Sequence, residues 1–508
     1  MSTQPTTSRT PDPAPSADER PENADAVVVG AGVAGLTAAR ALRARGLRVV
    51  VLEAADVPGG PVRGGDLPGL EGVRVDVGAE SFASRGTAVG ELVRDLGLDV
   101  VEPSGAGAWG YAAGRAYPLP RAGVLGIPAY PWSHDVRRAV GLGGALRASL
   151  DRVLPGRFAD RRTLETFTRS RMGARVTERL VAPVAAGVHS APLDRLDVAA
   201  VAPGLLDAFD REGSLSRAVA SLRALAPAGS AVRGIDGGLH RLVEELDRGV
   251  DVRLRHEVTD LARRPARSTE SDGARTDPAP GDATSPSVWV VRAQTPDGPV
   301  ALAAPRLVVT TPALVDQLGP LVGGPADLLP DPEPGADVRL VTLLLRAPEL
   351  DDSPRGTGLL VAPPHRDAGR TTPPSDVEAK ALTHSTAKWP WLRERVRAVA
   401  GPGHHVVRLS YGRIGATSEP DLDRVVADSS RLFGVDLHGR VLGHVVTRWN
   451  GALPPPTPAY RREVAALVDR VDAVPGLAVT GGWIAGTGLA SIVGHAQECA
   501  RVLSPHDE

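Results

Sequence analysis

The sequence contains very little cysteine, few aromatic residues and no long apolar run. Cys499 is the single cysteine among 508 residues, which excludes an intrachain disulfide and a cysteine-cluster metal site. Basic and acidic side chains number 58 and 60, so the formal net charge of −2 argues against an electrostatic nucleic-acid binder. No apolar run approaches the roughly 18 residues of a membrane-spanning helix, and we therefore predict no transmembrane segment.

The remaining composition is that of a folded chain with a few unstructured segments. Hydrophobic residues make up 42% of the chain, and its length predicts about two to four domains. Residues 1–23 are rich in Pro, Ser, Thr, Asp and Glu and lack the apolar core of a signal peptide, which predicts a disordered tail and a cytoplasmic protein. Segments 263–287 and 323–335 have a similar composition and are interpreted as loops.

The strongest local motif is Gly30-Ala31-Gly32-Val33-Ala34-Gly35, a complete G-x-G-x-x-G. It follows the apolar run 26–29 and precedes a helix predicted over 36–45. A second strand is predicted over 48–52 and ends at Glu53, which lies 18 positions after Gly35. This order of strand, glycine turn, helix, strand and acidic residue is typical of a dinucleotide-binding βαβ unit.

Each residue type in the motif has a physical role. Gly30 allows the tight turn, Gly32 lets the backbone approach a pyrophosphate, and Gly35 permits close packing of the helix on the strand. The unpaired N–H groups of the helix N-terminus attract the phosphates. Glu53 can accept hydrogen bonds from a ribose.

Later segments favour FAD over NAD. The Gly59-Gly60 pair followed by Arg63 resembles the extended FAD motif of the flavin amine oxidase superfamily, and segment 75–82 resembles the loop beside its flavin. Near the C-terminus, a predicted strand and glycine turn over 476–482 lead to a final helix. In that superfamily the N-terminus of this helix points at the isoalloxazine, where its dipole favours negative charge on the reduced flavin.

Within this superfamily, the chain resembles the porphyrinogen oxidases of haem biosynthesis. The matching segments keep the family's order from residue 25 to residue 503; they are 115–120 with 126–128, 178–188, 237–242, 388–390, and 448–449 with Pro454. Segments 189–192 and 494–496 depart from the family pattern. Both departures concern the shape of the substrate pocket.

The resemblance implies FAD-dependent oxidation of coproporphyrinogen III to coproporphyrin III, with oxygen as acceptor and hydrogen peroxide as by-product. It also implies contact with the next haem-pathway enzyme. Coproporphyrinogen is favoured because the arginine-rich composition indicates a high-GC Gram-positive source. The alternatives are protoporphyrinogen IX oxidation, carotenoid desaturation, a flavin amine oxidase, and a porphyrin-binding flavoprotein without turnover. The glutamate that amine oxidases usually carry near the C-terminal motif is missing from 481–487.

The dinucleotide motif and the resemblance together assign residues to the site. The cofactor candidates are Gly30, Ala31, Gly32, Val33, Ala34, Gly35, Glu53, Ala54, Gly60, Arg63, Gly78, Ala79, Glu80, Ser81, Val258, Trp449, Gly486, Thr487, Gly488 and Leu489. For Trp449, a place over the flavin and a place in the core both stay open. Arg85, His189 and Lys388 are the substrate candidates, with no catalytic base required and no metal site predicted.

The predicted fold is α/β, or α+β overall. A discontinuous, doubly wound FAD-binding domain is expected from residues 24–90, 231–320 and 447–503. A helical block over 91–230 and a strand-rich substrate domain over 321–446 complete the chain after the tail, 1–23. We expect a cytoplasmic protein, with a peripheral position at the membrane as the alternative.

Overall fold

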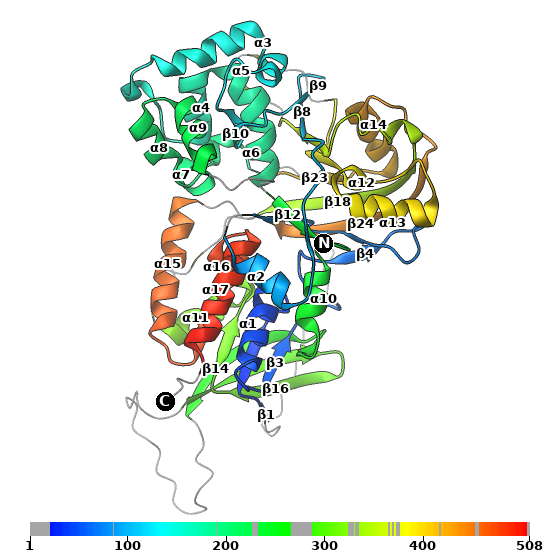
Figure 1. Cartoon of the computed structure of the whole chain (residues 1–508). Helices are drawn as coiled ribbons and strands as arrows, with labels where there is room; N and C mark the ends of the chain where they lie inside the picture. Colours follow the sequence, from blue (N-terminus) through cyan, green and yellow to red (C-terminus); the bar gives the residue numbers. More distant parts are fainter. Residues whose placement is uncertain are drawn as a thin grey trace, which may run out of the picture.

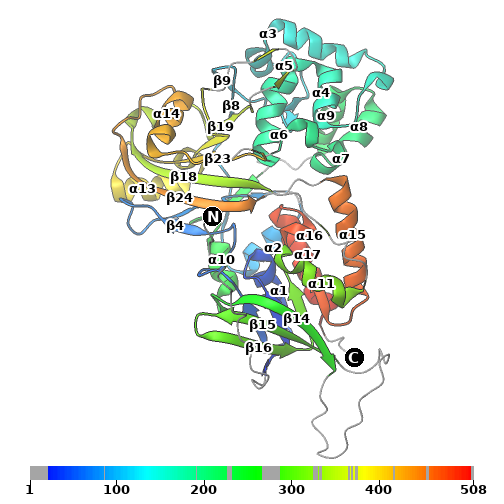
Figure 2. The same cartoon turned by 180° about the vertical axis from the view of Figure 1, so that it is seen from behind.

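The described residues form three bodies in the computed structural model (Figures 1 and 2). We call them the parallel-sheet domain, the strand-rich domain and the helical block. The structure describes residues 21–84, 86–189, 191–225, 232–265, 287–323, 330, 335–363, 366–367, 370–371, 376–415, 418–452 and 457–504. Most of the predicted tail, much of both predicted loops, and Arg85 lie outside these residues.

The parallel-sheet domain is built on a five-stranded sheet drawn from distant parts of the chain. Its order is β13 (Asp251–Arg253), β3 (Val49–Leu52), β2 (Ala26–Val29), β17 (Leu307–Val309), β25 (Leu477–Val479), and every pairing is parallel. β2, β3, β17 and β25 are buried throughout, which explains why they read as continuous apolar runs.

Helices and a second sheet cover the two faces of this sheet. One face packs against α1 (Val33–Arg43), α2 (Ala88–Asp95), α10 (Arg241–Asp247) and α17 (Leu489–Val502). The other face packs against β14 (Glu257–Pro265), β15 (Ser287–Thr295), β16 (Gly298–Ala304), η5 (Pro312–Leu314), α11 (Val315–Val322), α15 (Pro458–Asp472) and α16 (Gly482–Ala485). The alternation of side chains sends Val28 to the first face and Val29 to the second.

The strand-rich domain contains a seven-stranded sheet. Its order is β24 (Val441–Ala452), β18 (Ala336–Arg346), β23 (His404–Tyr411), β22 (Ala381–His384), β19 (Gly358–Val361), β8 (Trp109–Ala112), β9 (Arg115–Pro118). Around it lie η7 (Pro348–Leu350), α12 (Ser385–Lys388), α13 (Pro390–Ala400), α14 (Leu422–Phe433) and the pair β20 (Arg366–Asp367) and β21 (Arg370–Thr371). α14 packs on one face of the sheet, and α13 packs with Leu344 and Val406 from the other.

Short strands join the bodies. The hairpin of β4 (Gly64–Asp66) and β5 (Arg74–Asp76) leads into the three-stranded sheet of β6 (Phe82–Ala83), β12 (Val232–Ile235) and β7 (Val100–Val101). This small sheet stands at the two points where the chain leaves and re-enters the parallel-sheet domain.

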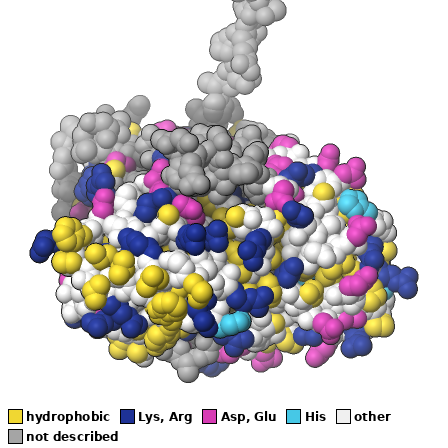
Figure 3. All heavy atoms as spheres, turned by 90° about the horizontal axis from the view of Figure 1, so that it is seen from above, with side chains coloured by type: hydrophobic (Ala, Val, Ile, Leu, Met, Phe, Trp, Pro, Cys, Tyr) yellow, Lys and Arg dark blue, Asp and Glu magenta, His cyan; other side chains and the backbone are white. Residues whose placement is uncertain are grey.

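The helical block has its own core, in which Phe167 and Phe209 meet edge-on with ring centroids 5.1 Å apart. Its elements are β10 (Gly123–Val124), β11 (Ile127–Pro128), α3 (His134–Ser149), η1 (Leu150–Arg152), η2 (Gly156–Phe158), α4 (Leu164–Met172), α5 (Ala174–Val176), η3 (Thr177–Val181), α6 (Ala182–His189), η4 (Leu193–Arg195), α7 (Val198–Val201), α8 (Leu205–Glu212) and α9 (Leu215–Leu225). Seen from above, clusters of hydrophobic side chains lie among basic and acidic ones on the visible face (Figure 3).

Three predicted boundaries differ from the observed structure. β1 (Glu22–Asn23) pairs with Leu302 and Ala303, so ordered structure begins inside the predicted tail. β8 and β9 fall within the range assigned to the helical block but belong to the seven-stranded sheet. The boundary at residue 447 cuts β24, which continues to Ala452 because it stays paired with β18. These pairings join distant segments, so local sequence patterns do not reveal them.

No helix within the described residues is long and apolar enough to cross a bilayer.

Candidate flavin site

The glycine motif forms the turn between β2 and α1. Gly30 has a positive φ of 99°, and a Cβ on Gly35 would lie 1.9 Å from the Gly30 carbonyl oxygen, so the helix can cross the strand only if residue 35 is glycine. Gly32 is the N-cap of α1, and a Cβ there would meet no described atom within 4 Å. No side chain of the described residues caps this helix, which leaves its first N–H groups available to an anion.

Glu53 lies at the end of β3, beside this turn. Its Oε2 accepts a hydrogen bond from the Ala31 N–H at 2.7 Å, and its Oε1 accepts one from the Ala55 N–H at 2.9 Å. Each carboxylate oxygen keeps a lone pair for a ribose hydroxyl. The backbone N–H of His256 donates to the Glu53 carbonyl at 2.8 Å, which brings the start of β14, and with it Val258, towards this part of the site.

Residues 59–63 connect the glycine turn to a second loop, residues 76–81. The Gly59 N–H donates to the Ala31 carbonyl at 2.8 Å, and the Ala79 N–H donates to the Pro61 carbonyl at 2.8 Å. A Cβ on Gly78 would lie 1.9 Å from the Pro61 carbonyl oxygen, so glycine is required where the two loops touch. The predicted cofactor residues Gly60, Arg63, Gly78 and Ala79 therefore belong to one contiguous surface.

Trp449 reaches this surface from β24 of the strand-rich domain. The guanidinium of Arg63 stacks over its ring at 5.0 Å, and its indole N–H donates to the Val77 carbonyl at 3.4 Å. Trp449 also packs against Val338 and its neighbours in the sheet. The structure thus places Trp449 in contact with both the loop and an apolar cluster.

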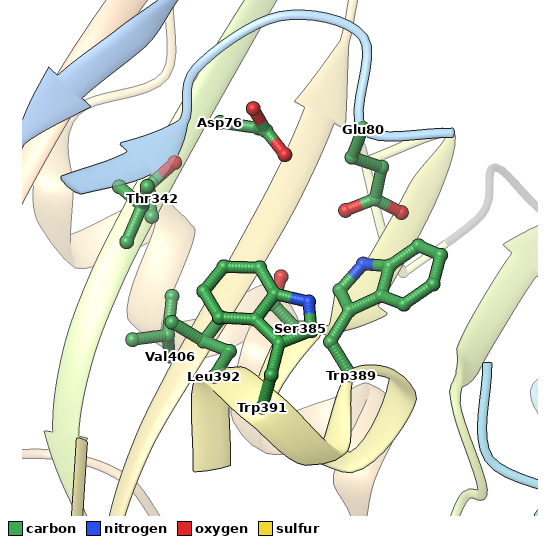
Figure 4. Close-up of a pocket in the computed structure, with 9 residues that line it drawn as sticks. Asp76, Glu80, Thr342, Ser385, Trp389, Trp391, Leu392 and Val406 are labelled. Carbon is green, nitrogen blue, oxygen red and sulfur yellow. The ribbon is translucent and has the colours of Figure 1, made fainter. Parts of the chain in front are cut away.

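Glu80 lies on the second loop, and its carboxylate points towards the ring of Trp389 (Figure 4). Its Oε1 lies 2.6 Å from the Lys388 ammonium and its Oε2 lies 3.2 Å from the Arg408 guanidinium, while only 9% of its side chain is exposed. Burial alone would raise the pKa of Glu80, but the charges of Arg408 and Lys388 outweigh it and lower the pKa from 4.5 to about 2. The carboxylate is therefore ionised at neutral pH.

Two residues that the sequence did not single out hold the loop in place. Arg408, on β23, donates to the Gly78 carbonyl at 2.6 Å. Asp76 accepts from the backbone N–H groups of Leu239 and His240, each at 2.9 Å, and from the His240 ring at 2.8 Å. A charged residue inside the apolar strand Val406-Val407-Arg408-Leu409 was the available signal for Arg408.

The C-terminal segment brings a second helix N-terminus into the domain. Gly486 has a positive φ of 85°, and Gly488 is the N-cap of α17, which has no side-chain cap among the described residues. α17 packs along α1, and Leu489 and Val493 lie in the same core as Leu36 (Figure 1). Thr487 lies in the turn between these glycines.

The three substrate candidates lie in different parts of the chain. Lys388 is paired with Glu80 and also lies 5.0 Å from the centroid of the Trp389 ring, so it belongs to the loop. His189 ends α6 in the helical block, where burial lowers its pKa and where α6 packs against β19 and β8. Arg85 lies outside the described residues, one position beyond Ser84.

These features define a dinucleotide-binding fold. A sequence profile of the family described as flavin containing amine oxidoreductase matches residues 33–330, and the chain belongs to that family. It is therefore a flavin-dependent oxidoreductase, and its cofactor is FAD. The open N-cap at Gly32, the anchored Glu53 and the glycine contact between the two loops all fit the group.

Relatives of known name match nearly the whole chain. A coproporphyrinogen III oxidase from Mycobacterium tuberculosis is 29% identical, covering 92% of this chain and 95% of its own. A coproporphyrinogen III oxidase from Propionibacterium freudenreichii is 29% identical, covering 98% of this chain and 93% of its own. The crystal structure of a protein from Exiguobacterium sp. named as a protoporphyrinogen oxidase shares the fold, with a TM-score of 0.70, 22% identity, and coverage of 95% and 98%.

Proposed function

We propose that this protein oxidises coproporphyrinogen III to coproporphyrin III in haem biosynthesis, with molecular oxygen as the acceptor. The observation that carries the proposal is the end-to-end similarity to coproporphyrinogen III oxidases, which spans 92–98% of this chain. A match over the glycine motif alone would support only a shared cofactor. A match that also includes the helical block and the strand-rich domain supports a shared substrate.

The balanced reaction removes six hydrogens from the porphyrinogen and reduces three molecules of oxygen to three of hydrogen peroxide. Bound FAD would supply the two-electron acceptor in each of three cycles. The chain's own residues would bind and orient the cofactor and the substrate. Glu53 and the N-terminus of α1 would hold the nucleotide part of FAD. Lys388, Glu80 and Arg408 hold the loop at residues 76–81, which would lie beside the flavin ring, and the proposed reaction needs no strong base from the chain.

A porphyrinogen has an apolar ring and carboxylate edges, so its site needs apolar walls and a few cations. Trp449, Val338 and Leu340 provide an apolar wall beside the loop. We also place the enzyme in the cytoplasm, with its product passing to the next haem-pathway enzyme.

The test uses the FAD-loaded protein with coproporphyrinogen III, protoporphyrinogen IX and a primary amine in separate assays. We expect porphyrin fluorescence, oxygen uptake and peroxide with coproporphyrinogen III, at a higher kcat/KM than with the other two. Gly32→Ala, which should bind FAD poorly, is the matched control. Preference for protoporphyrinogen or for the amine would refute the proposed substrate. Binding of coproporphyrin without any turnover would show a carrier.

A further inference from the structure

An apolar wall runs from the loop at residues 76–81 towards the helical block. It begins at Trp449, whose indole donates to the Val77 carbonyl, and continues through Val338 and Leu340 on β18. Ile414 packs against this cluster and also against the core of the helical block. This apolar cluster therefore contacts the loop at residues 76–81 through Trp449 and the helical block through Ile414.

A cation lies next to Ile414 at the far end of this wall. Arg413 follows the turn at Gly412, where a Cβ would lie 1.8 Å from the Asp337 carbonyl oxygen, so the turn is pressed against the start of β18. The Nη2 of Arg413 donates to the Val361 carbonyl at 2.9 Å. Its Nη1 is buried and has no hydrogen-bond partner, and no ion pair joins Arg413 to a carboxylate within the described residues.

The surroundings of Arg413 destabilise its positive charge unless an anion is bound. Burial lowers the pKa of Arg413 to about 10. Lys380, which is 4% exposed, has its pKa lowered to about 7, by burial and then by the charge of Arg413. Burial therefore makes the charge of Arg413 costly, and an anion brought to its guanidinium would stabilise that charge.

We propose that the Arg413 guanidinium binds a carboxylate of the substrate through its unpaired Nη1, while the ring of the substrate lies along the wall formed by Trp449, Val338, Leu340 and Ile414. A charge-assisted hydrogen bond to a guanidinium is the strong form of this contact. This assignment rests on the proposed function and names its carboxylate-binding residue. It makes Arg413 a specificity residue, because the contact distinguishes a carboxylate from an uncharged group.

The experiment measures binding of two porphyrins to the FAD-loaded protein by fluorescence titration. Coproporphyrin III carries the carboxylates, and its tetramethyl ester carries the same ring without charge. For Arg413→Met we expect the Kd of coproporphyrin III to rise about tenfold to a hundredfold, while that of the ester changes less than about twofold. Arg413→Lys should restore part of the affinity, and in turnover KM should rise more than kcat falls.

Arg292→Met is the matched control, because Arg292 is ion-paired with Asp260 on the sheet of β14 and β15. FAD content and the unfolding transition of each variant verify folding. If Arg413→Met raises the Kd of both porphyrins equally, or leaves both Kd values unchanged, the carboxylate assignment is overturned. The proposed function still holds in that case if the wild-type protein oxidises coproporphyrinogen III. A wild-type protein that neither binds nor oxidises any porphyrinogen overturns both.

Discussion

At the scale of single residues, two glycines of the same motif have separable physical roles. The hypothetical Cβ of Gly35 collides with the Gly30 carbonyl inside the protein, whereas that of Gly32 points into open space at the N-terminus of α1. Gly35 is therefore a requirement of the fold. We propose that glycine is needed at position 32 for a different reason, to let the pyrophosphate of FAD approach the N-terminus of α1.

Substituting the two glycines separately should show this division. Gly32→Ala should leave the urea midpoint of the apoprotein unchanged or slightly higher, since the φ of −69° suits alanine, and should weaken FAD binding about tenfold or more. Gly35→Ala should lower the stability of the apoprotein by about 1–3 kcal/mol, as overpacking does. Urea unfolding and flavin fluorescence titration measure the two effects. An apoprotein of Gly32→Ala that binds FAD like wild type would contradict this assignment.

Because of Glu80, the stability of the folded protein should depend on pH in the acidic range. Its folded pKa of about 2 lies below the ordinary 4.5, so its contribution is complete above about pH 4.5 and is lost as pH falls towards 2. Glu80→Gln leaves Lys388 and Arg408 without their anion, and we expect it to cost about 3 kcal/mol at pH 7. Urea midpoints of both proteins should converge as the pH falls below about 4.5.

Glu71→Gln is the control for this titration, because Glu71 is exposed in the turn between β4 and β5. Its midpoints should follow those of the wild type at every pH. A constant gap between wild type and Glu80→Gln down to pH 3 would show that Glu80 does not titrate in this window.

The sequence predicted the parts of the site that are local in the chain. The spacing of Gly30, Gly32, Gly35 and Glu53 is set by one βαβ unit, so the motif can be recognised from the sequence alone. Arg408 and Asp76 were missed because their partners are far away: Arg408 binds the Gly78 carbonyl, and Asp76 binds His240. Lys388, a substrate candidate, forms an ion pair with Glu80, and its contact with the substrate stays a prediction.

At the scale of elements, the helical block contains a buried ion pair between Asp151 and Arg171. Asp151, in η1, accepts from the Arg171 Nε at 2.8 Å and from the backbone N–H groups of Leu215 at 3.0 Å and Ser216 at 2.8 Å. Asp151 and Arg171 are both fully buried. The carboxylate thus joins α4 to the first turn of α9, where a negative charge is favourable. No sequence motif indicates this contact, because Asp151 and its partners on α9 are more than sixty positions apart.

Removing this carboxylate should destabilise the block without removing the flavin. Asp151→Ala leaves a buried guanidinium unpaired, and we expect a loss of about 3–5 kcal/mol. Asp210→Ala is the control, since Asp210 pairs with Arg161 on the surface and should change the unfolding transition very little. Differential scanning calorimetry and the flavin content of the purified variants measure the outcome. An Asp151→Ala protein as stable as the Asp210→Ala control would show that the pair is dispensable.

At the scale of the whole molecule, the parallel sheet holds three distant parts of the chain together. β2 and β3 come from the N-terminal part, β13 and β17 from the middle, and β25 from the C-terminal part. The order of motifs in the sequence predicts this discontinuity. The exact ends of each part depend on strand pairs such as β24 with β18, which form between residues about a hundred positions apart.

A ligand that contacts all three parts should protect all three together. We expect FAD to slow amide hydrogen exchange in residues 26–35, 53–63 and 477–489 and to leave the interior of α8 and α9 unchanged, measured by mass spectrometry on apoprotein and holoprotein. Free FAD at about a hundred times its Kd should stabilise the whole protein by about 2.7 kcal/mol. Because the C-terminal part contributes β25 and the start of α17, its protection is the decisive measurement. Protection confined to residues 26–63 would mean that the C-terminal strand and helix complete the sheet but do not contact the cofactor.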